Sequence, residues 1–203
     1  MPLPIGHALA GIALQQACPG FFSAHRWLDA FFFMFLANLP DADFIPGLLS
    51  GRPNQFHHGA FHSLGAALAV AAIGAGFFCL KNRRADARAH GRFWVPAAMI
   101  FLLFLSHLLL DLFALDLRAP FGLPLFWPFS GRYFIAASPL FINITRSSAA
   151  GDFFPSLFNS HNLAAALREV LILGSVALAA AWLRARTEKN RRARAGKGGV
   201  SGG

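Results

Sequence analysis

The sequence contains four apolar stretches that are each long enough to cross a lipid bilayer as a helix. They are Trp27–Leu49, Phe61–Leu80, Phe93–Leu115 and Leu163–Leu183. The hydrocarbon core of a bilayer is about 30 Å thick, which about 20 apolar residues can span in a helix. A shorter apolar stretch, Ile5–Ala17, predicts either a brief spanning helix or a re-entrant one. We therefore expect an all-α integral membrane protein with four to five apolar helices.

The composition also favours a membrane protein. Only 13% of the residues are charged and 56% are hydrophobic, whereas soluble domains carry about 25% charged residues. The formal net charge is +9, but the basic residues flank apolar stretches. This placement favours contact with lipid headgroups over sequence-specific nucleic-acid binding. Cys18 and Cys79 have no metal-type spacing and are expected to be small apolar packing residues. The N-terminus lacks the features of a removable signal peptide.

The basic residues predict the orientation in the membrane. Lys81–Arg92 contains five Lys or Arg, and the tail after Leu183 contains seven, whereas the longer segment Asp116–Asn162 contains three. The positive-inside rule places the first two in the cytoplasm and the third outside. The prolines and aromatic residues of Asp116–Asn162 predict an extracytoplasmic, interfacial segment without a continuous helix. Residues 1–183 thus form the predicted polytopic membrane domain, and residues 184–203 a basic, Gly-rich disordered cytoplasmic tail.

Histidines and aspartates occur within or beside the apolar stretches, where an ionisable group is costly unless it is used. His107 and Asp111, like His58 and His62, are four residues apart and share a helix face. In the predicted topology, such residues from four or five separate segments lie at one depth near the outer surface. The full set is His7, Asp41, Asp43, His57, His58, His62, His107 and Asp111, with Glu169 as an outlying member.

Imidazole and carboxylate ligands together suit a divalent transition metal, with Zn²⁺ favoured and Mn²⁺ or Fe²⁺ as alternatives. Eight candidates exceed the four ligands of one tetrahedral ion. Either two ions bind, or some residues support the ligands or act as a base, for which Asp41 and Glu169 are the candidates. Each residue also has an ordinary explanation: a buried histidine can be hydrogen-bonded, and the Asp41–Asp43 pair can cap a turn. One metal centre, however, explains most of them together.

Four motifs in this order are characteristic: Asn38–Asp43 (NLPDAD), His57–Leu64 (HHGAFHSL), Ser106–Asp111 (SHLLLD) and Gly122–Pro128 (GLPLFWP). They resemble the YdjM-type family, which is described as LexA-binding, inner-membrane-associated and a metal-dependent hydrolase. The resemblance covers roughly residues 5–128. It implies a location in the bacterial inner membrane. The metal site that it implies consists of His7, Asp41, Asp43, His57 or His58, His62, His107 and Asp111. His58 stands where the family pattern has arginine, so His57 matches the family histidine.

We therefore expect a membrane-bound hydrolase that acts on an ester or phosphoester of a lipid or envelope substrate at the outer membrane-water interface. Two other functions stay open. A metal or proton transporter is disfavoured because the inner halves of the apolar stretches hold few ionisable residues. A non-catalytic membrane regulator would use its basic tail to contact acidic lipid or a cytoplasmic partner.

Overall fold

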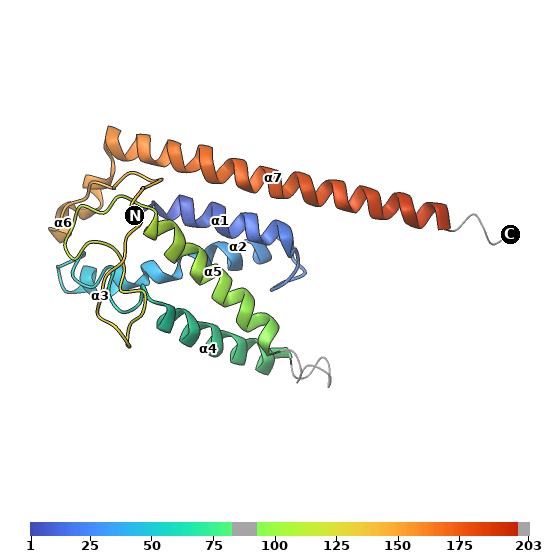
Figure 1. Cartoon of the computed structure of the whole chain (residues 1–203), viewed down its shortest axis with the longest axis horizontal. Helices are drawn as coiled ribbons and strands as arrows, with labels where there is room; N and C mark the ends of the chain where they lie inside the picture. Colours follow the sequence, from blue (N-terminus) through green and yellow to red (C-terminus); the bar gives the residue numbers. More distant parts are fainter. Residues whose placement is uncertain (83–92, 199–203) are drawn as a thin grey trace.

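The computed structural model describes residues 1–82 and 93–198, and all of its regular elements in these ranges are helical. Two isolated β-bridges, Ala114 with Phe141 and Leu123 with Phe134, are the exceptions to helix and loop there. The helices form an elongated bundle (Figure 1). In chain order the elements are α1 Pro4–Ala17, α2 Arg26–Asn38, η1 Leu39–Asp43, α3 Phe44–Leu49, α4 Leu64–Asn82, α5 Trp94–Leu112, α6 Ala150–Phe153, η3 Pro155–Leu157 and α7 Ser160–Gly198.

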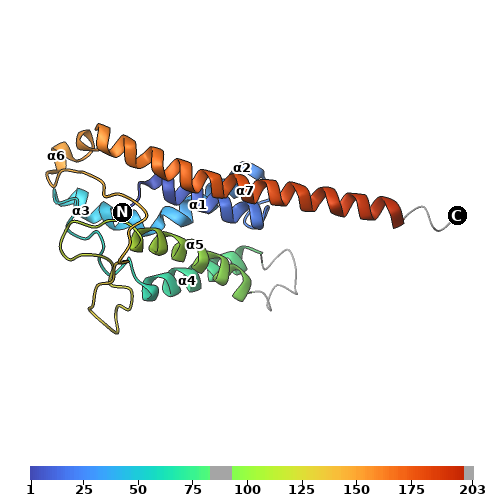
Figure 2. The ribbon, with the colours of Figure 1, turned by 45° about the horizontal axis from the view of Figure 1, so that its top comes forward.

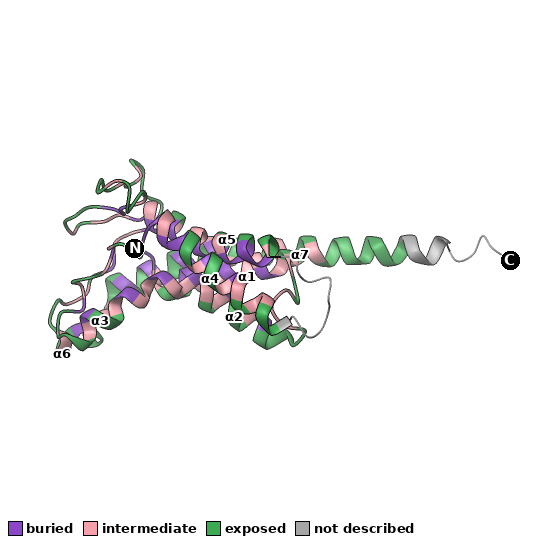
Figure 3. Ribbon diagram, turned by 90° about the horizontal axis from the view of Figure 1, so that it is seen from below, coloured by how far each residue is buried: buried purple, intermediate pink, exposed green. Residues whose placement is uncertain are grey.

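Four helical segments are long and apolar enough to cross a membrane: Arg26–Leu49, Leu64–Lys81, Trp94–Leu112 and Ser160–Ala193. They coincide with the four long apolar stretches of the sequence, so the predicted all-α membrane fold is confirmed. Large apolar side chains on these segments face outward, which is the arrangement that lipid contact requires. Figure 3 shows the exposed residues on the outer faces of the bundle and the buried ones between the helices.

The short helix α1 lies inside the bundle, alongside α2 and α7 (Figure 2). Gly11 allows α1 and α2 to approach closely, because a Cβ at this position would lie 2.6 Å from the carbonyl oxygen of Phe33. Phe33 and Leu103 are fully buried and help to form the core between α2 and α5. This packing holds the first residues of α1, and His7 with them, against the end of the bundle where the site forms.

The segment between α5 and α7 is mainly loop, as its proline content predicted, and contains only the short elements α6 and η3. It folds over one end of the bundle and is anchored there. The amide of Leu64, the first residue of α4, donates to the carbonyl of Leu125 over 2.9 Å. Leu123 is fully buried against Phe104 and Leu108 of α5. The loop therefore has a fixed position above the polar end of the helices.

The chain after Leu183 differs from our prediction. We expected disorder from residue 184 onward, but α7 continues as a helix to Gly198. This part of the chain has no proline and is rich in Arg, Ala and Lys, which are good helix formers. Arg184 and Glu188 also form an ion pair over 2.8 Å at i,i+4 spacing. The basic loop predicted at Lys81–Arg92 lies mostly outside the described residues.

Candidate metal centre

The polar residues come together at the end of the bundle where α2 and α5 end and where α1, α4 and α7 begin (Figure 1). Two of the carboxylates follow α2 directly. Pro40 cannot donate a backbone hydrogen bond, and its ring is incompatible with a continued α-helix. The chain consequently tightens into the 3-10 helix η1, which carries Asp41 and Asp43. Asp43 is buried, and Asp41 is only partly accessible.

The loop between α3 and α4 supplies three histidines. The ring of His57 stacks on Phe44 with 3.9 Å between the ring centroids, which fixes its position. His58 has a φ of 58°, a left-handed conformation that is uncommon for a residue with a side chain and often marks a functional position. His62 precedes α4 and is completely buried.

The helices α1 and α5 supply the rest of the cluster. His107 and Asp111 lie one turn apart on α5 and are both buried, as the i,i+4 spacing predicted. His7 of α1 is also completely buried, and its ring stacks on that of His107 with 3.6 Å between the centroids. Nε2 of His7 lies 3.6 Å from Oδ1 of Asp111. Helices that are distant in sequence therefore deliver imidazole and carboxylate groups to one place.

Three donor atoms in this cluster, from His62, His107 and Asp111, have the mutual spacing of ligands to a single ion, and Oδ1 of Asp41 lies close to two of them. Nε2 of His107 is 3.2 Å from Oδ2 of Asp111 and 3.3 Å from Nε2 of His62. Oδ1 of Asp41 is 3.6 Å from Nε2 of His107 and 3.7 Å from Nε2 of His62. Nε2 of His62 is 3.4 Å from Oδ2 of Asp111. Ligand atoms of a tetrahedral zinc ion, each about 2 Å from the metal, are about 3.3 Å apart. The match to the observed spacing is close.

Other ligand groups overlap with these residues. The donor atoms of Asp41, Asp43, His57 and His62 lie within 4.8 Å of one another, as do those of His7, His107 and Asp111, and those of His57, His58 and His62. Together these groups contain all eight residues that the sequence nominated as metal ligands. The structure therefore brings the eight together, while the binding of metal itself stays a prediction.

Many polar atoms of the cluster are buried without a hydrogen-bond partner in the described residues, including both nitrogens of His7 and both carboxylate oxygens of Asp41 and of Asp111. Such atoms are costly in a folded protein. The protein satisfies another fully buried carboxylate completely: Asp29 accepts hydrogen bonds from Gln15 and from the amides of Gly20 and Phe22. The donor set at the cluster thus fits a divalent cation, which would satisfy the unpartnered lone pairs.

Two of the unpartnered atoms lie very close together. Nδ1 of His62 and Oδ2 of Asp43 are only 2.8 Å apart, yet neither takes part in a hydrogen bond in the described residues. The pair is therefore a close contact between an imidazole and a carboxylate, both of which can bind a divalent cation.

A family model described as YdjM inner membrane protein matches residues 1–189. The chain belongs to this family. No curated protein and no solved structure matches the chain. The match includes three of the candidate spans, most of the fourth and the whole ligand cluster, so the helices and the polar end of the bundle fall within one family match.

Two of the YdjM histidines are oriented by groups outside the ligand cluster. Nδ1 of His107 lies 2.8 Å from the carbonyl oxygen of Ala37, to which it donates. Nδ1 of His58 lies 3.3 Å from Oδ2 of Asp116, while its Nε2 faces Asp111 at 3.7 Å. Metal-binding histidines typically have their other ring nitrogen held in this way by a carbonyl or carboxylate.

Asp116 was not among the residues that the sequence nominated, because it follows α5 in what reads as ordinary loop. Its carboxylate accepts hydrogen bonds from the amides of Arg118 and Gly122 over 3.0 and 2.9 Å. Burial opposes its ionisation, but His58 and the two amides outweigh this effect and lower the pKa of Asp116 to about 2. Its position five residues after Asp111, at the helix end, is the signal that could have identified it.

Glu169 lies apart from the ligand groups. It is buried on α7, and its Oε1 accepts a hydrogen bond from the amide of Leu3 over 2.8 Å. Its Oε2 is near Gly6, where a Cβ would lie only 2.8 Å from that oxygen. The carboxylate therefore contacts the start of α1, and a role for Glu169 as a base stays a prediction.

Proposed function

We propose that the protein is a membrane-bound hydrolase that uses one or two divalent metal ions, with zinc favoured. Its proposed substrate is an ester or phosphoester of a lipid or envelope component. The observation that carries the proposal is the meeting of eight imidazole and carboxylate side chains, many with buried and unpartnered donor atoms, at one end of a membrane bundle. Membership of the YdjM inner membrane family agrees with the location.

The residues that would hold the metal are His7, Asp41, Asp43, His57, His58, His62, His107 and Asp111. When bound there, a divalent ion would polarise the carbonyl or phosphoryl oxygen of a substrate and lower the pKa of a coordinated water. Burial of His62, His107 and Asp111 excludes bulk water from the centre. Asp41, which contacts several of the histidines and has no hydrogen-bond partner in the described residues, is proposed either as a ligand or instead as the acceptor of the proton from the attacking water, with Glu169 as the alternative acceptor.

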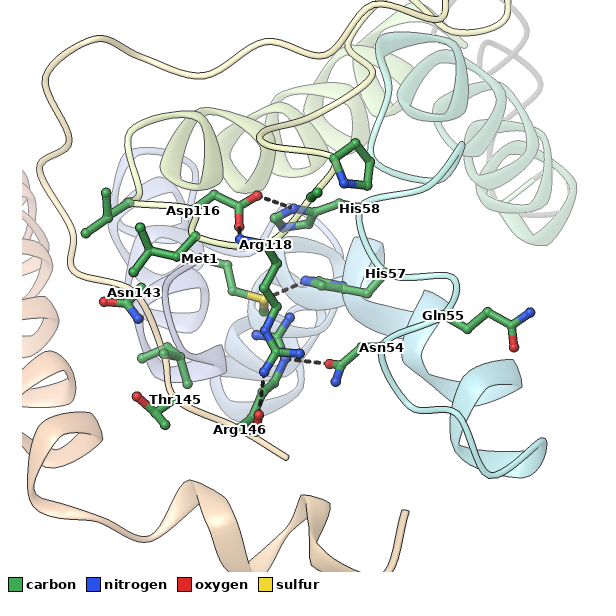
Figure 4. A pocket seen from close by; sticks show the side chains of 15 residues that line it. Met1, Asn54, Gln55, His57, His58, Asp116, Arg118, Asn143, Thr145 and Arg146 are labelled. Carbon is green, nitrogen blue, oxygen red and sulfur yellow. Dashed lines mark hydrogen bonds and ion pairs between the residues drawn. The ribbon is translucent and has the colours of Figure 1, made fainter. Parts of the chain in front are cut away.

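A cavity beside the cluster is the proposed entry for the substrate. This cavity of about 410 Å³ is lined by both His57 and His58 and by the loop that follows α5 (Figure 4). We place this end of the bundle on the outer side of the inner membrane, because the basic residues after Leu183 favour a cytoplasmic C-terminus. The substrate would then reach the centre at the depth of the outer headgroups.

Metal analysis of the detergent-purified protein tests the proposal. His62 contacts Asp41, Asp43 and Asp111, so His62→Ala is expected to abolish metal retention. His25→Ala removes an exposed histidine and serves as the control. The metal-loaded protein is then assayed with carboxylic esters and phosphoesters. Equal stoichiometric metal in the wild type and in His62→Ala would contradict the proposed centre, and absence of turnover with every ester would contradict the reaction.

A further inference from the structure

Two arginines meet in the cavity that opens beside the metal centre. Arg118 follows α5 and Arg146 precedes α6, so 27 residues of chain separate them. Both line the cavity, and the guanidinium of Arg118 donates to the carbonyl oxygen of Arg146 (Figure 4). The Asp116–Asn162 segment holds only one other Lys or Arg, Arg132, which is exposed and does not line this cavity.

Arg146 is held in place through only part of its guanidinium. Its Nε donates to Oδ1 of Asn54 over 2.7 Å, and its Cζ lies 5.2 Å from the centre of the Phe44 ring. The two terminal nitrogens take part in no hydrogen bond among the described residues. The group is therefore oriented in advance, with the N–H groups that commonly bind oxyanions still available.

The described part of the chain pairs neither arginine directly with a carboxylate. In the part of the chain that the structure describes, neither Arg118 nor Arg146 forms an ion pair within 4.0 Å. The one carboxylate that lines the cavity, Asp116, is occupied by two backbone amides and by His58. Burial and the neighbouring Arg118 lower the pKa of Arg146 to about 10, against the opposing effect of Asp41, Asp111 and Asp116, so it is still charged at neutral pH. Two adjacent, partly buried cations that form no close ion pair with a carboxylate in the described residues favour binding of an anion.

The same end of the protein also has an apolar cavity, of about 600 Å³. Phe56, Phe61 and Pro46 are among its lining residues, and His57 and His58 line it as well as the arginine cavity. The two histidines beside the metal centre therefore lie between a cationic cavity and an apolar one. This arrangement would match a substrate that has a charged part on one side of its scissile bond and an apolar part on the other.

We propose that Arg118 and Arg146 form a binding site for the phosphate of the substrate, and that the substrate is an amphiphilic phosphoester whose apolar part occupies the second cavity. This inference rests on the proposed hydrolase and narrows its substrate class from esters to phosphoesters. Arginine presents several N–H groups in a plane and commonly binds phosphate through two of them. A neutral carboxylic ester would leave both guanidinium groups without an anionic partner.

Binding of inorganic phosphate to the detergent-purified, full-length protein tests the site by isothermal titration calorimetry. Arg118→Gln and Arg146→Gln are each expected to weaken phosphate binding at least tenfold, and Arg146→Lys to weaken it less. Arg132→Gln, which removes the same charge from the same segment outside the cavity, is expected to bind as the wild type does. Wild-type affinity in both Arg118→Gln and Arg146→Gln, or no phosphate binding by the wild type, overturns the proposal. If Arg146→Gln does not fold, Arg118→Gln decides.

Metal content and phosphate binding are measured on the same samples, so that the two proposals can fail separately. Phosphate binding that persists after treatment with a chelator and depends on the arginines supports the anion site, even where no metal is found. Phosphate binding that vanishes with the metal and is indifferent to the arginines overturns it, while the metal centre stands.

Competition experiments distinguish the source of the phosphate. Glycerol phosphate is compared with phosphatidic acid in mixed micelles, with diacylglycerol in the same micelles as the uncharged control. Stronger displacement of phosphate by phosphatidic acid supports an amphiphilic phosphoester, and equal displacement by glycerol phosphate contradicts the role of the apolar cavity while the arginine site for phosphate stands. Displacement by diacylglycerol as effective as that by phosphatidic acid overturns the assignment of the cavity to phosphate.

Discussion

The ring of His107 is tied to the carbonyl oxygen of Ala37, 2.8 Å from its Nδ1. Ala37 is fully buried near the end of α2, two residues before η1 begins. Because Nδ1 donates to this carbonyl, Nε2 keeps its lone pair for a cation, and it lies 3.2 Å from Oδ2 of Asp111, a second cation ligand. The same bond sets α5 against the helix that leads directly to Asp41, so that ligands from two helices share one position.

His107→Ala is therefore expected to reduce bound metal more than tenfold, since it removes a ligand and the tie to Ala37 at once. Inductively coupled plasma mass spectrometry of purified protein gives the ratio of metal to chain. His161→Ala provides a second control, because His161 is exposed and contacts only the carbonyl of Asn143. A His107→Ala protein with the metal content of the wild type would exclude His107 as a ligand.

Much of this architecture could be predicted from the sequence, because lipid imposes a simple rule on length and polarity. A run such as Phe93–Leu115 has to be helical across a bilayer, and the helix α5 occupies Trp94–Leu112. The i,i+4 spacing then placed His107 and Asp111 on one face. The uneven distribution of basic residues predicted the direction in which each span crosses the membrane. His62 and His107 were therefore expected at the same end of the bundle, and their Nε2 atoms lie 3.3 Å apart there.

The sequence could not predict the features that depend on loop conformation. Arg118 and Arg146 meet only because the segment after α5 folds back over the bundle, a path that proline content does not specify. The role of Asp116 depends in the same way on the left-handed turn at His58. The composition of the tail led us to predict disorder after Leu183, for a different reason. A high charge prevents a segment from forming a buried core, but it does not prevent the segment from forming a helix, as α7 does there.

Asp116→Asn is expected to weaken metal binding by about 10- to 100-fold, because groups that orient ligand histidines typically have effects of this size. The amide would keep one oxygen for the loop amides, but the charge beside Nδ1 of His58 would be lost. Competition with a metallochromic chelator measures the affinity. Asp152→Asn, at an exposed carboxylate of α6, is the matched control. Unchanged affinity in Asp116→Asn would show that His58 does not need this carboxylate.

Gly11→Ala is expected to destabilise the fold by about 1–3 kcal/mol, the usual cost of overpacking. Its new methyl group would lie 2.6 Å from the Phe33 carbonyl and 3.2 Å from Cβ of Ala37, which forces α1 away from α2. Gly76→Ala is the control, since a Cβ there meets nothing within 4 Å. The control is expected to keep or raise the unfolding temperature, because alanine favours a helix over glycine by about 0.5–1 kcal/mol. Thermal unfolding in detergent compares the two variants, and equal unfolding temperatures would contradict close packing at Gly11.

Glu169 allows a structural and a catalytic role to be separated. Because its Oε1 accepts the amide of Leu3, Glu169→Gln keeps an acceptor and is expected to leave metal content and unfolding temperature close to wild type. Glu169→Ala removes the acceptor from a buried amide and is expected to destabilise the protein by about 1–3 kcal/mol. Both expected results follow if Glu169 holds the start of α1, the helix that carries His7. Phosphoesterase turnover completes the comparison: a Glu169→Gln protein that is stable and fully metal-loaded, yet inactive, would instead identify Glu169 as the base and displace Asp41 from that role.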